Sequence, residues 1–258
     1  MHQSATWSTN YSEKIAHLIY SMECEEEELL LIDLINRFKY LNGFEYEQSL
    51  KMIASTIVDN WRLKPQDTMI ISKNLDDGTD SSDAVVHSLK HKFSPYISAG
   101  WSKNNFSNHV RKCLDKPSTS NFVVADDFIG SGNQLYDFCE WFELEAAKRG
   151  KANPNLYVVC VAAMATALSK SYTPSFRDIY SHVKLNKGIS EQISDPQSVT
   201  TALDLMKTIE RRNRVSEKYR FGYEKSEALY YCESLGVPNN VFPVFWKRSF
   251  SSTIFDRI

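Results

Sequence analysis

Three short stretches of the chain are almost continuously apolar, and a polar segment follows each of them. They cover residues 68–72, 122–125 and 155–163. Apolar runs of this length predict strands that are buried on both faces of a parallel sheet. A fourth strand is predicted over residues 178–184. Because helical segments alternate with these strands, the sequence predicts an α/β fold with a mainly parallel, doubly wound sheet.

Helical spacing is clearest directly after the second apolar run. A helix is predicted over residues 133–148, and one face of it carries Leu135, Phe138, Cys139, Phe142 and Ala146. Two further helices are predicted over residues 81–93 and 197–212, each with apolar residues three or four positions apart. A single apolar face on each helix is the pattern of a helix that packs on a sheet.

The first part of the chain shows helical spacing and no strand signal. Residues 11–62 therefore predict a helical N-terminal appendage over residues 1–64, followed by the α/β domain over residues 65–258. Four consecutive acids, Glu25 to Glu28, fit the first turn of a helix, where negative charge favours the macrodipole. The alternative for this acidic run is a docking patch for a basic partner.

The junction between the second strand and its helix combines acids with glycines. Asp126 and Asp127 end the strand, and Gly130 and Gly132 allow a tight turn that exposes backbone N–H groups. A helix N-terminus binds phosphate, and carboxylates accept hydrogen bonds from vicinal ribose hydroxyls. Ligands of open α/β sheets bind beyond the carboxyl ends of the strands, where this turn lies. The pattern predicts a ribose 5-phosphate site; the alternative is an ordinary turn with solvated acids.

The stretch from Phe122 to Gln134 resembles the phosphoribosyl-pyrophosphate (PRPP) binding motif of type I phosphoribosyltransferases. Four apolar residues, two acids, two apolar residues and a small glycine-containing loop follow one another in the family's order. The resemblance implies that Asp126 and Asp127 hold the ribose hydroxyls and serve catalysis. It assigns the 5-phosphate to Phe128, Ile129, Gly130, Ser131, Gly132, Asn133 and Gln134. Gln134 departs from the Ser or Thr that is usual in the family, although its amide still donates to phosphate.

A second loop of the resembling family contacts pyrophosphate after an early strand. The comparable residues here are Lys73, Ser81 and Ser82. The acids between and beside them are suited to recruit Mg²⁺, and they are Asp76, Asp77, Asp80 and Asp83. The resemblance implies Mg²⁺ bound together with the ligand, and no protein residue is directly predicted as a metal ligand. The alternative is a surface turn with a capping serine.

Residues 94–120 lack clear periodicity and are rich in polar residues. Long connections of this kind are often functional or mobile. In the resembling family a mobile loop closes over the reaction centre, so the segment is expected to become ordered when a ligand binds. Its cations are suited to meet phosphate oxygens, and they are Lys103, Arg111, Lys112 and Lys116. The alternative is a solvated surface excursion.

The C-terminal part adds a second resemblance. From Phe221 through Asn239 and Asn240 to Trp246, the chain resembles the end of the phosphoribosyltransferase-like domain (PRTase-CE) of bacterial antiviral conflict systems such as retrons. In that context Asn239, Asn240 and Trp246 are expected to form a hood over a base or substrate, because amides pair with base edges and an indole stacks on them. The alternative is a turn with a buried tryptophan.

Composition and charge narrow the classes of protein and of metal site. The chain of 258 residues has a formal net charge of −2, so no global field would hold nucleic acid. No apolar run approaches the roughly 20 residues of a membrane span. The five cysteines are scattered without a CxxC pair, which predicts reduced thiols and a cytoplasmic protein. His87 and His91 have the spacing of metal ligands, but no third ligand is near in sequence.

The two resemblances together imply an effector of a bacterial antiphage defence system. It is expected to bind PRPP or a nucleotide and to act at ribose C1, by glycosyl transfer or nucleotide cleavage. Positioning and charge stabilisation would supply most of the rate, since no nucleophile or general base is visible. The alternative is a catalytically inactive nucleotide-sensing module or a structural subunit of a defence complex. The expected partners are PRPP or a nucleotide and a protein, such as a reverse transcriptase with its nucleic acid; no membrane is expected.

Overall fold

The chain packs as two units. The structure is a computed structural model that describes residues 6–73, 81–151, 153–169, 176–250 and 252–257. One unit, the sheet unit, is Phe44–Lys184, and the other, the terminal unit, combines Met1–Gly43 with Leu185–Ile258. This division differs from the predicted one at residue 64, because the last part of the chain packs with the first helices.

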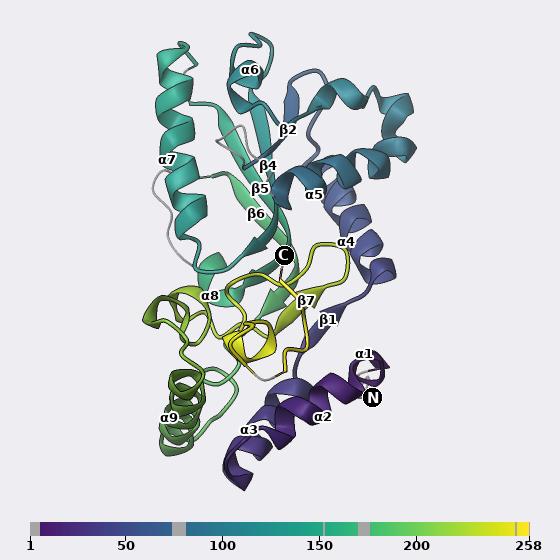
Figure 1. Cartoon of the computed structure of the whole chain (residues 1–258). Helices are drawn as coiled ribbons and strands as arrows, with labels where there is room; N and C mark the ends of the chain where they lie inside the picture. The colour runs from purple at the N-terminus through teal and green to yellow at the C-terminus, as the bar shows by residue number, and fades with distance from the viewer. Residues whose placement is uncertain (1–5, 74–80, 152, 170–175, 251, 258) are drawn as a thin grey trace. The chain divides into compact units, whose positions relative to one another are not determined.

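The sheet unit alternates strands and helices (Figure 1). Its strands are β2 (Thr68–Ser72), β3 (Phe106–Ser107), β4 (Asn121–Ile129), β5 (Asn155–Met164) and β6 (Asp178–Leu185). Its helical elements are α4 (Gly43–Ser55), the π-helical turn η1 (Thr56–Asn60), α5 (Ser81–Lys90), the 3-10 helices η2 (His91–Ala99) and η3 (Lys103–Asn105), α6 (Val110–Leu114), α7 (Asn133–Lys148) and α8 (Ala165–Leu168).

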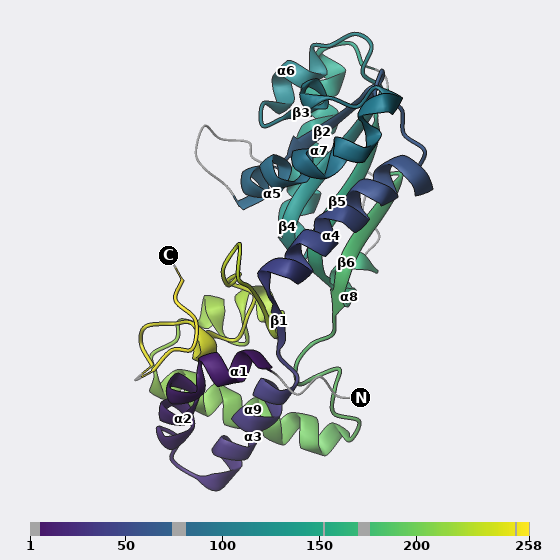
Figure 2. The same ribbon diagram turned by 90° about the vertical axis from the view of Figure 1, so that its right-hand side faces the viewer.

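The order of strands in this sheet is β3-β2-β4-β5-β6. β2 pairs in parallel with both β3 and β4, and β4 pairs in parallel with β5. The sheet lies between α7 on one side and α4 and α5 on the other, which both views show (Figures 1 and 2). The predicted α/β class is therefore confirmed, and the apolar runs at 122–125 and 155–163 lie in the adjacent strands β4 and β5. Because the chain leaves β2 toward β3 and returns to β4 on the other side, the topological switch point lies between β2 and β4.

The core of the sheet unit explains why the apolar runs were visible in the sequence. All five residues of β2 are buried, and the side chains from Phe122 to Ala125 are completely buried. Phe122 also packs edge-on against Phe142 of α7, with ring centroids 5.1 Å apart. Each fully buried apolar side chain contributes about 1.5–3 kcal/mol. The strands that carry the site are thus held from both faces of the sheet.

The segment of residues 94–120 has more regular structure than its sequence pattern predicted. It contains the end of η2, all of η3, the edge strand β3 and α6. Trp101 is only 1% exposed, and Asn105 donates to the backbone oxygens of Pro65 and Thr68 at 2.7 and 3.0 Å. Elements of two to nine residues leave no periodic signal, which is why they were missed. Ordering of the segment by a ligand stays a prediction.

The terminal unit joins the two ends of the chain. Its helices are α1 (Thr6–Asn10), α2 (Ser12–Tyr20), α3 (Glu25–Asn36) and α9 (Pro196–Arg212), with 3-10 turns η4 (Glu217–Tyr219), η5 (Tyr223–Lys225) and η6 (Pro243–Phe245). The strands β1 (Lys39–Leu41) and β7 (Tyr230–Cys232) pair in parallel. α9 confirms the predicted helix, whereas β1 was not predicted. Its pairing partner lies far away in the sequence, so local spacing gave no signal for it.

An ion pair ties α3 to α9 within the terminal unit. Arg212 lies 2.6 Å from the Glu27 carboxylate and 2.9 Å from that of Glu23. Glu27 therefore belongs to the internal packing of the unit, whereas Glu25 and Glu26 are exposed and Glu28 is half-buried. No helix in the described part of the chain has the length and apolar character needed to cross a membrane.

Candidate functional site

The strand register places two distant residues side by side at the switch point. Ser72 of β2 pairs with Ala125 of β4, so the next residues, Lys73 and Asp126, are neighbours at the carboxyl ends of the two strands. The Lys73 ammonium lies 2.6 Å from Oδ2 of Asp126. The sequence had assigned Lys73 to a separate loop, and only the register shows that it meets the acid pair.

The Lys73–Asp126 ion pair is withdrawn from solvent. The Asp126 side chain is 1% exposed and that of Lys73 is 13% exposed. The other carboxylate oxygen, Oδ1, accepts a hydrogen bond from the backbone N–H of Asp127 at 3.0 Å. Both oxygens of Asp126 therefore have protein partners. Since removal of one member of a buried pair leaves the other charge uncompensated, this pair fixes the geometry of the strand ends.

Asp127 is in a different electrostatic state from its neighbour. Desolvation is the main cause that raises its pKa to about 7, and the negative charge of Asp126 and a hydrogen bond with that carboxyl act in the same direction. The Ser81 hydroxyl and the Lys73 ammonium oppose the rise of the Asp127 pKa. The half-buried carboxyl of Asp127 therefore exchanges its proton near neutral pH. A group of this kind suits proton transfer or hydrogen bonding to a hydroxyl.

The loop after β4 presents a helix N-terminus beside the acids. Gly132 has φ +83° and directly precedes α7, so a left-handed residue forms the turn. The Ser131 hydroxyl accepts from the backbone N–H of Asn133 at 3.3 Å. Phe128 and Ile129 are 8% and 3% exposed, so their side chains pack in the protein interior. Backbone donors at the start of α7 are the groups suited to a phosphate.

Gln134 joins this network. Its side-chain oxygen Oε1 accepts from the Lys73 ammonium at 3.4 Å. Lys73 thus bridges Asp126 and Gln134, and the Gln134 amide nitrogen is left as a donor. The residue that departs from the family's usual hydroxyl is therefore connected to the acid pair through Lys73. The sequence contained the departure but not this connection.

The two serines predicted for a pyrophosphate loop also lie at the acid pair. Ser81 and Ser82 begin α5, and the Ser82 hydroxyl accepts from the backbone N–H of Lys73 at 3.2 Å. Ser81 hydrogen-bonds the Asp127 carboxyl. Strand ends, α5 and α7 therefore contribute to one site. The acids Asp76, Asp77 and Asp80, predicted to recruit Mg²⁺, lie outside the described residues.

Protein groups for a resident metal are not assembled in the described part of the chain. No three side chains of His, Cys, Asp or Glu come together there to hold an ion. The rings of His87 on α5 and His91 at the start of η2 lie 5.6 Å apart and have no third ligand among those residues. Mg²⁺ that arrives with a pyrophosphate ligand stays a prediction.

The cations of residues 94–120 do not all serve the site as expected. The Lys116 ammonium lies 3.4 Å from Sδ of Met69, at the beginning of β2 and thus at the opposite end of the strand from Lys73. Arg111 lies over the Trp141 ring at 5.4 Å and pairs with Glu145. In this structure these two cations lie toward the other end of the sheet and not at the phosphate loop, and their contact with a bound phosphate stays a prediction.

The predicted hood residues lie in the terminal unit, where their polar groups have local partners. Asn240 donates to the Ser226 hydroxyl at 2.8 Å, and the indole N–H of Trp246 donates to the backbone oxygen of Val241 at 2.8 Å. The backbone oxygen of Asn239 accepts a hydrogen bond from the backbone N–H of Tyr223 at 2.8 Å. These contacts fit the alternative of a turn with a buried tryptophan. The hood itself stays a prediction.

Comparison with known protein families identifies the family of this chain. The model of the family described as PRTase-CE matches residues 7–257, nearly the whole chain. The chain belongs to the PRTase-CE family. This membership confirms the resemblance inferred from the two sequence stretches. In this PRTase-CE protein the match includes the N-terminal helices, so they are part of the family's pattern.

Solved structures give more distant likenesses. A hypoxanthine-guanine-xanthine phosphoribosyltransferase shares 12% identity with a TM-score of 0.33, over 55% of this chain and 74% of that one. A hypothetical protein from Neisseria gonorrhoeae with bound ppGpp shares 8% sequence identity with a TM-score of 0.37, and the match covers 64% of this chain and 96% of that one. Hypoxanthine phosphoribosyltransferase from Trypanosoma cruzi, in complex with IMP, shares 8% at a TM-score of 0.38, over 69% and 93%. Comparison with curated proteins gives no match.

Proposed function

We propose that this PRTase-CE protein binds a ribose 5-phosphate ligand, PRPP or a nucleotide, at Asp126 to Gln134 and acts at ribose C1. The single observation that carries the proposal is the contact between Lys73 and Asp126 at the switch point, beside Asp127 and the start of α7. The proposed reaction is glycosyl transfer or nucleotide cleavage. The bond from C1 to its leaving group breaks with the electron pair on that group, and C1 then bonds to the acceptor.

Each part of the site has a separate task in this proposal. Backbone N–H groups at the start of α7, with the Gln134 amide, hold the 5-phosphate. The Asp127 carboxylate accepts from a ribose hydroxyl. Lys73 compensates the charge of Asp126, so an anionic ligand meets one uncompensated acid instead of two. Fixed negative charge beside the ribose also stabilises the positive charge that develops at C1. A bound Mg²⁺ would neutralise a pyrophosphate leaving group.

Calorimetric titration tests the ligand. Mg²⁺–PRPP and nucleoside 5′-monophosphates are titrated into wild type, Asp127→Asn and the control Asp137→Asn, which changes an exposed acid on α7. Loss of a charged hydrogen bond of about 1.5–3 kcal/mol predicts about ten- to a hundredfold weaker binding for Asp127→Asn. Gly132→Val should abolish binding, because φ +83° and close backbone approach both exclude a branched side chain. The proposal fails if wild type binds none of these ligands, or if folded Asp127→Asn binds as wild type does.

A nucleotide sensor without turnover is the second candidate. The bridge from Lys73 to Gln134 favours it, because an amide tied to the acid pair stands where a hydroxyl is usual. Incubation with radiolabelled PRPP and with nucleotides separates the two functions. Release of pyrophosphate or free base supports the enzyme, and tight binding with no product after prolonged incubation supports the sensor.

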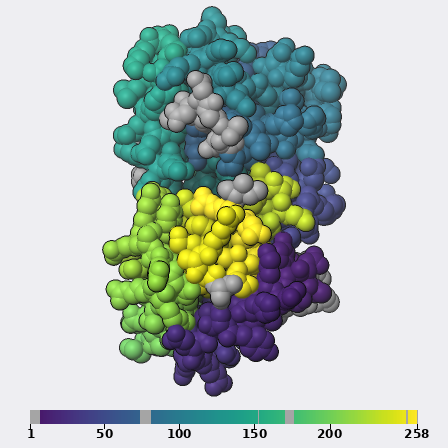
Figure 3. Space-filling model, viewed as in Figure 1, coloured from purple at the N-terminus to yellow at the C-terminus, as the bar shows by residue number. Residues whose placement is uncertain are grey.

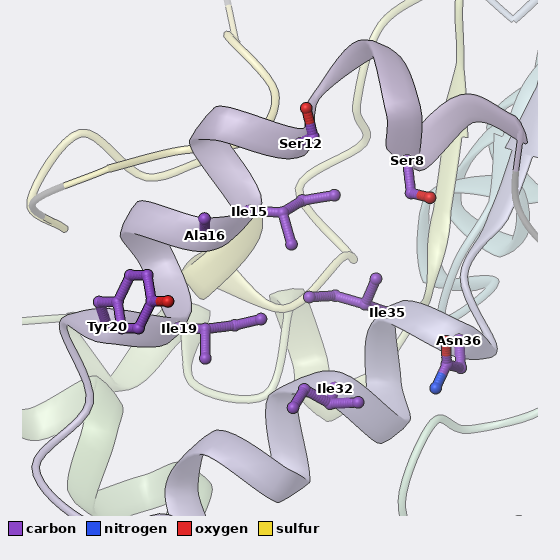
Figure 4. A pocket seen from close by; sticks show the side chains of 9 residues that line it. All are labelled: Ser8, Ser12, Ile15, Ala16, Ile19, Tyr20, Ile32, Ile35 and Asn36. Atoms are coloured by element: carbon purple, nitrogen blue, oxygen red, sulfur yellow. The ribbon is translucent and has the colours of Figure 1, made fainter.

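Docking of a protein partner is supported by a groove in the terminal unit. A hollow of about 420 Å³ lies between α2 and α3. Ile15 and Ile19 point across it toward Ile32 and Ile35 (Figure 4). Tyr20 at its rim is 82% exposed. Residues 12–37 carry seven acids and two Lys or Arg residues. The groove is lined mainly by apolar residues and its two helices carry more acids than bases, which fits an amphipathic helix that carries basic residues.

The docking function is tested with a defined partner, the reverse transcriptase or other protein encoded beside this gene. Co-expression and affinity capture use wild type, Ile32→Glu and the control Ile97→Glu, which alters an exposed isoleucine of the sheet unit. Ile32→Glu should lose the partner and Ile97→Glu should retain it. Retention by both variants would remove the groove as the docking site.

A bacterial antiphage defence system, such as a retron, is the proposed setting. The resemblance of residues 221–246 and the family membership support it. The cytoplasm is the proposed location, and all five cysteines are free. Phage plating on cells that carry the operon with wild type or Asp127→Asn tests this role. Equal plating with wild type and with an empty vector would argue against it.

A further inference from the structure

Three aromatic rings form a continuous group in the terminal unit. Tyr219 lies 6.1 Å from Tyr223 and 6.2 Å from Trp246, measured between ring centroids. Tyr219 and Tyr223 are half-buried, and Trp246 is 8% exposed. The rings come from η4, from η5 and from the residue that follows η6. Their positions are therefore set by three turns and not by one flexible loop.

Cations cover the faces of all three rings. The Lys218 ammonium lies 5.6 Å from the Tyr219 centroid and 5.4 Å from that of Tyr223. The Lys247 ammonium lies 5.8 Å from the Tyr219 centroid, on the same ring. The Arg257 guanidinium carbon lies 5.0 Å from the centroid of the Trp246 ring. Cation–π contacts of exposed side chains are weak and are readily exchanged for a better partner.

These three cations have no ion-pair partner among the residues that the structure describes, whereas Lys73 and Arg212 each have one. The surrounding sequence is strongly basic. Residues 211–225 and 246–257 hold nine Lys or Arg residues and three acids, although the whole chain has a net charge of −2. Segments of the chain near residue 220 (light green) and near its end (yellow) share one exposed face of the terminal unit in Figure 3. Positive charge is therefore placed directly at the rings by Lys218, Lys247 and Arg257.

We infer that this cation–aromatic patch, Lys218, Tyr219, Tyr223, Trp246, Lys247 and Arg257, binds single-stranded nucleic acid. Such a ligand offers phosphates at the spacing of its nucleotides and unpaired bases whose faces stack on aromatic rings. Lysines that now cover the tyrosine faces would move to the phosphates and free the rings for bases. A duplex keeps its bases stacked inside, so it would offer the patch only phosphates. The patch lies outside the sheet unit, so the inference goes beyond the ribose 5-phosphate site.

Fluorescence anisotropy of the full chain tests the inference. The probes are labelled single-stranded DNA and RNA of 20 nucleotides and the matching DNA duplex, each titrated at several salt concentrations. We expect a single strand to bind better than the duplex. Comparison of the affinities for the DNA and RNA single strands shows which of the two nucleic acids the patch prefers.

Two sets of variants identify the patch as the binding surface. The double variant Lys218→Gln/Lys247→Gln should bind about ten- to a hundredfold more weakly at low salt, and its salt slope should fall by about 1.4, at about 0.7 per lost phosphate contact. Lys207→Gln on α9 is the matched control and should bind as wild type does. Tyr219→Leu should weaken binding about tenfold or more, whereas Tyr219→Phe keeps the ring and should not.

Several results would overturn the inference. One is equal affinity and equal salt slope for the duplex and the single strands, since that would show phosphate attraction alone. Another is a double lysine variant that stays folded by circular dichroism and binds like Lys207→Gln. Loss of binding in Asp127→Asn would place the strand at the ribose 5-phosphate site instead. If single strands do not bind wild type at low salt, the patch has no such function, whatever the outcome of PRPP titration.

Discussion

Replacement of Asp127 by asparagine should stabilise the protein at alkaline pH while it weakens ligand binding. An ordinary aspartate has a pKa of about 3.8, and burial, followed by the charge of Asp126, raises the pKa of Asp127 to about 7. The folded protein therefore holds this proton more tightly than the unfolded chain does. Between these two values the folded state binds more protons, so the stability of wild type falls as the pH rises from about 4 to about 7.

The magnitude follows from the same two values. Each pH unit between them corresponds to about 1.36 kcal/mol, so the ionised Asp127 lowers the free energy of unfolding by about 4 kcal/mol at most at pH 8. Asparagine has nearly the same shape and no charge to desolvate, so it avoids this cost. Below about pH 4 both side chains are neutral in either state, and the difference between the two proteins should vanish.

Urea denaturation at pH 4, 6 and 8 measures the effect. We expect the unfolding midpoint of Asp127→Asn to exceed that of wild type at pH 8, by an amount that shrinks steadily toward pH 4. The exposed Asp137→Asn should follow wild type throughout. The reasoning is refuted if Asp127→Asn unfolds at the same or lower urea concentration at pH 8, or if the gap is independent of pH. A variant that is more stable yet binds PRPP or nucleotide more weakly would assign Asp127 to function.

Three further changes test other parts of the structure. Lys73→Met should lower the free energy of unfolding by about 3–5 kcal/mol, because it leaves a buried carboxylate unpaired, and Lys73→Arg should lose much less in the same urea titration. Gly222→Ala should unfold the terminal unit on gentle heating, since φ is +78° and a Cβ would overlap the backbone oxygen of Asn240. The control Gly150→Ala has φ +69° but open space around the Cβ, so its free energy of unfolding should fall by only about 1–2 kcal/mol. Burial raises the pKa of Glu210 to about 8, so Glu210→Gln should have a higher urea midpoint than wild type at pH 8.5. Equal midpoints at that pH would contradict the raised pKa of Glu210.

The acid pair shows how far a motif carries a functional prediction. The sequence indicated that Asp126 and Asp127 end a strand beside a phosphate loop, and it gave both the same role. The structure separates them, since Asp126 is held by Lys73 and Asp127 has a raised pKa. Burial and the distances between side chains decide whether each carboxyl is ionised, and neither can be derived from the order of residues in the sequence.

The sequence by itself determined the strands and helices whose signal is local. The runs at 68–72, 122–125 and 155–163 are apolar because both faces of these strands are covered, and the α7 face from Leu135 to Ala146 repeats with the helix period. These patterns can be recognised without knowing which segments pack against each other. They also placed the glycine turn at Gly132, where a left-handed residue precedes the helix.

Only the tertiary structure decided which distant segments meet. The strand β1 exists because residues 39–41 pair with residues 230–232, and the short edge strand β3 exists because Phe106 pairs with Ile70. In the same way, the register of β2 against β4 brings Lys73 to Asp126 and so completes the candidate site. Segments this short are not stable alone, so their positions follow from packing energy summed over the whole unit and not from local preference.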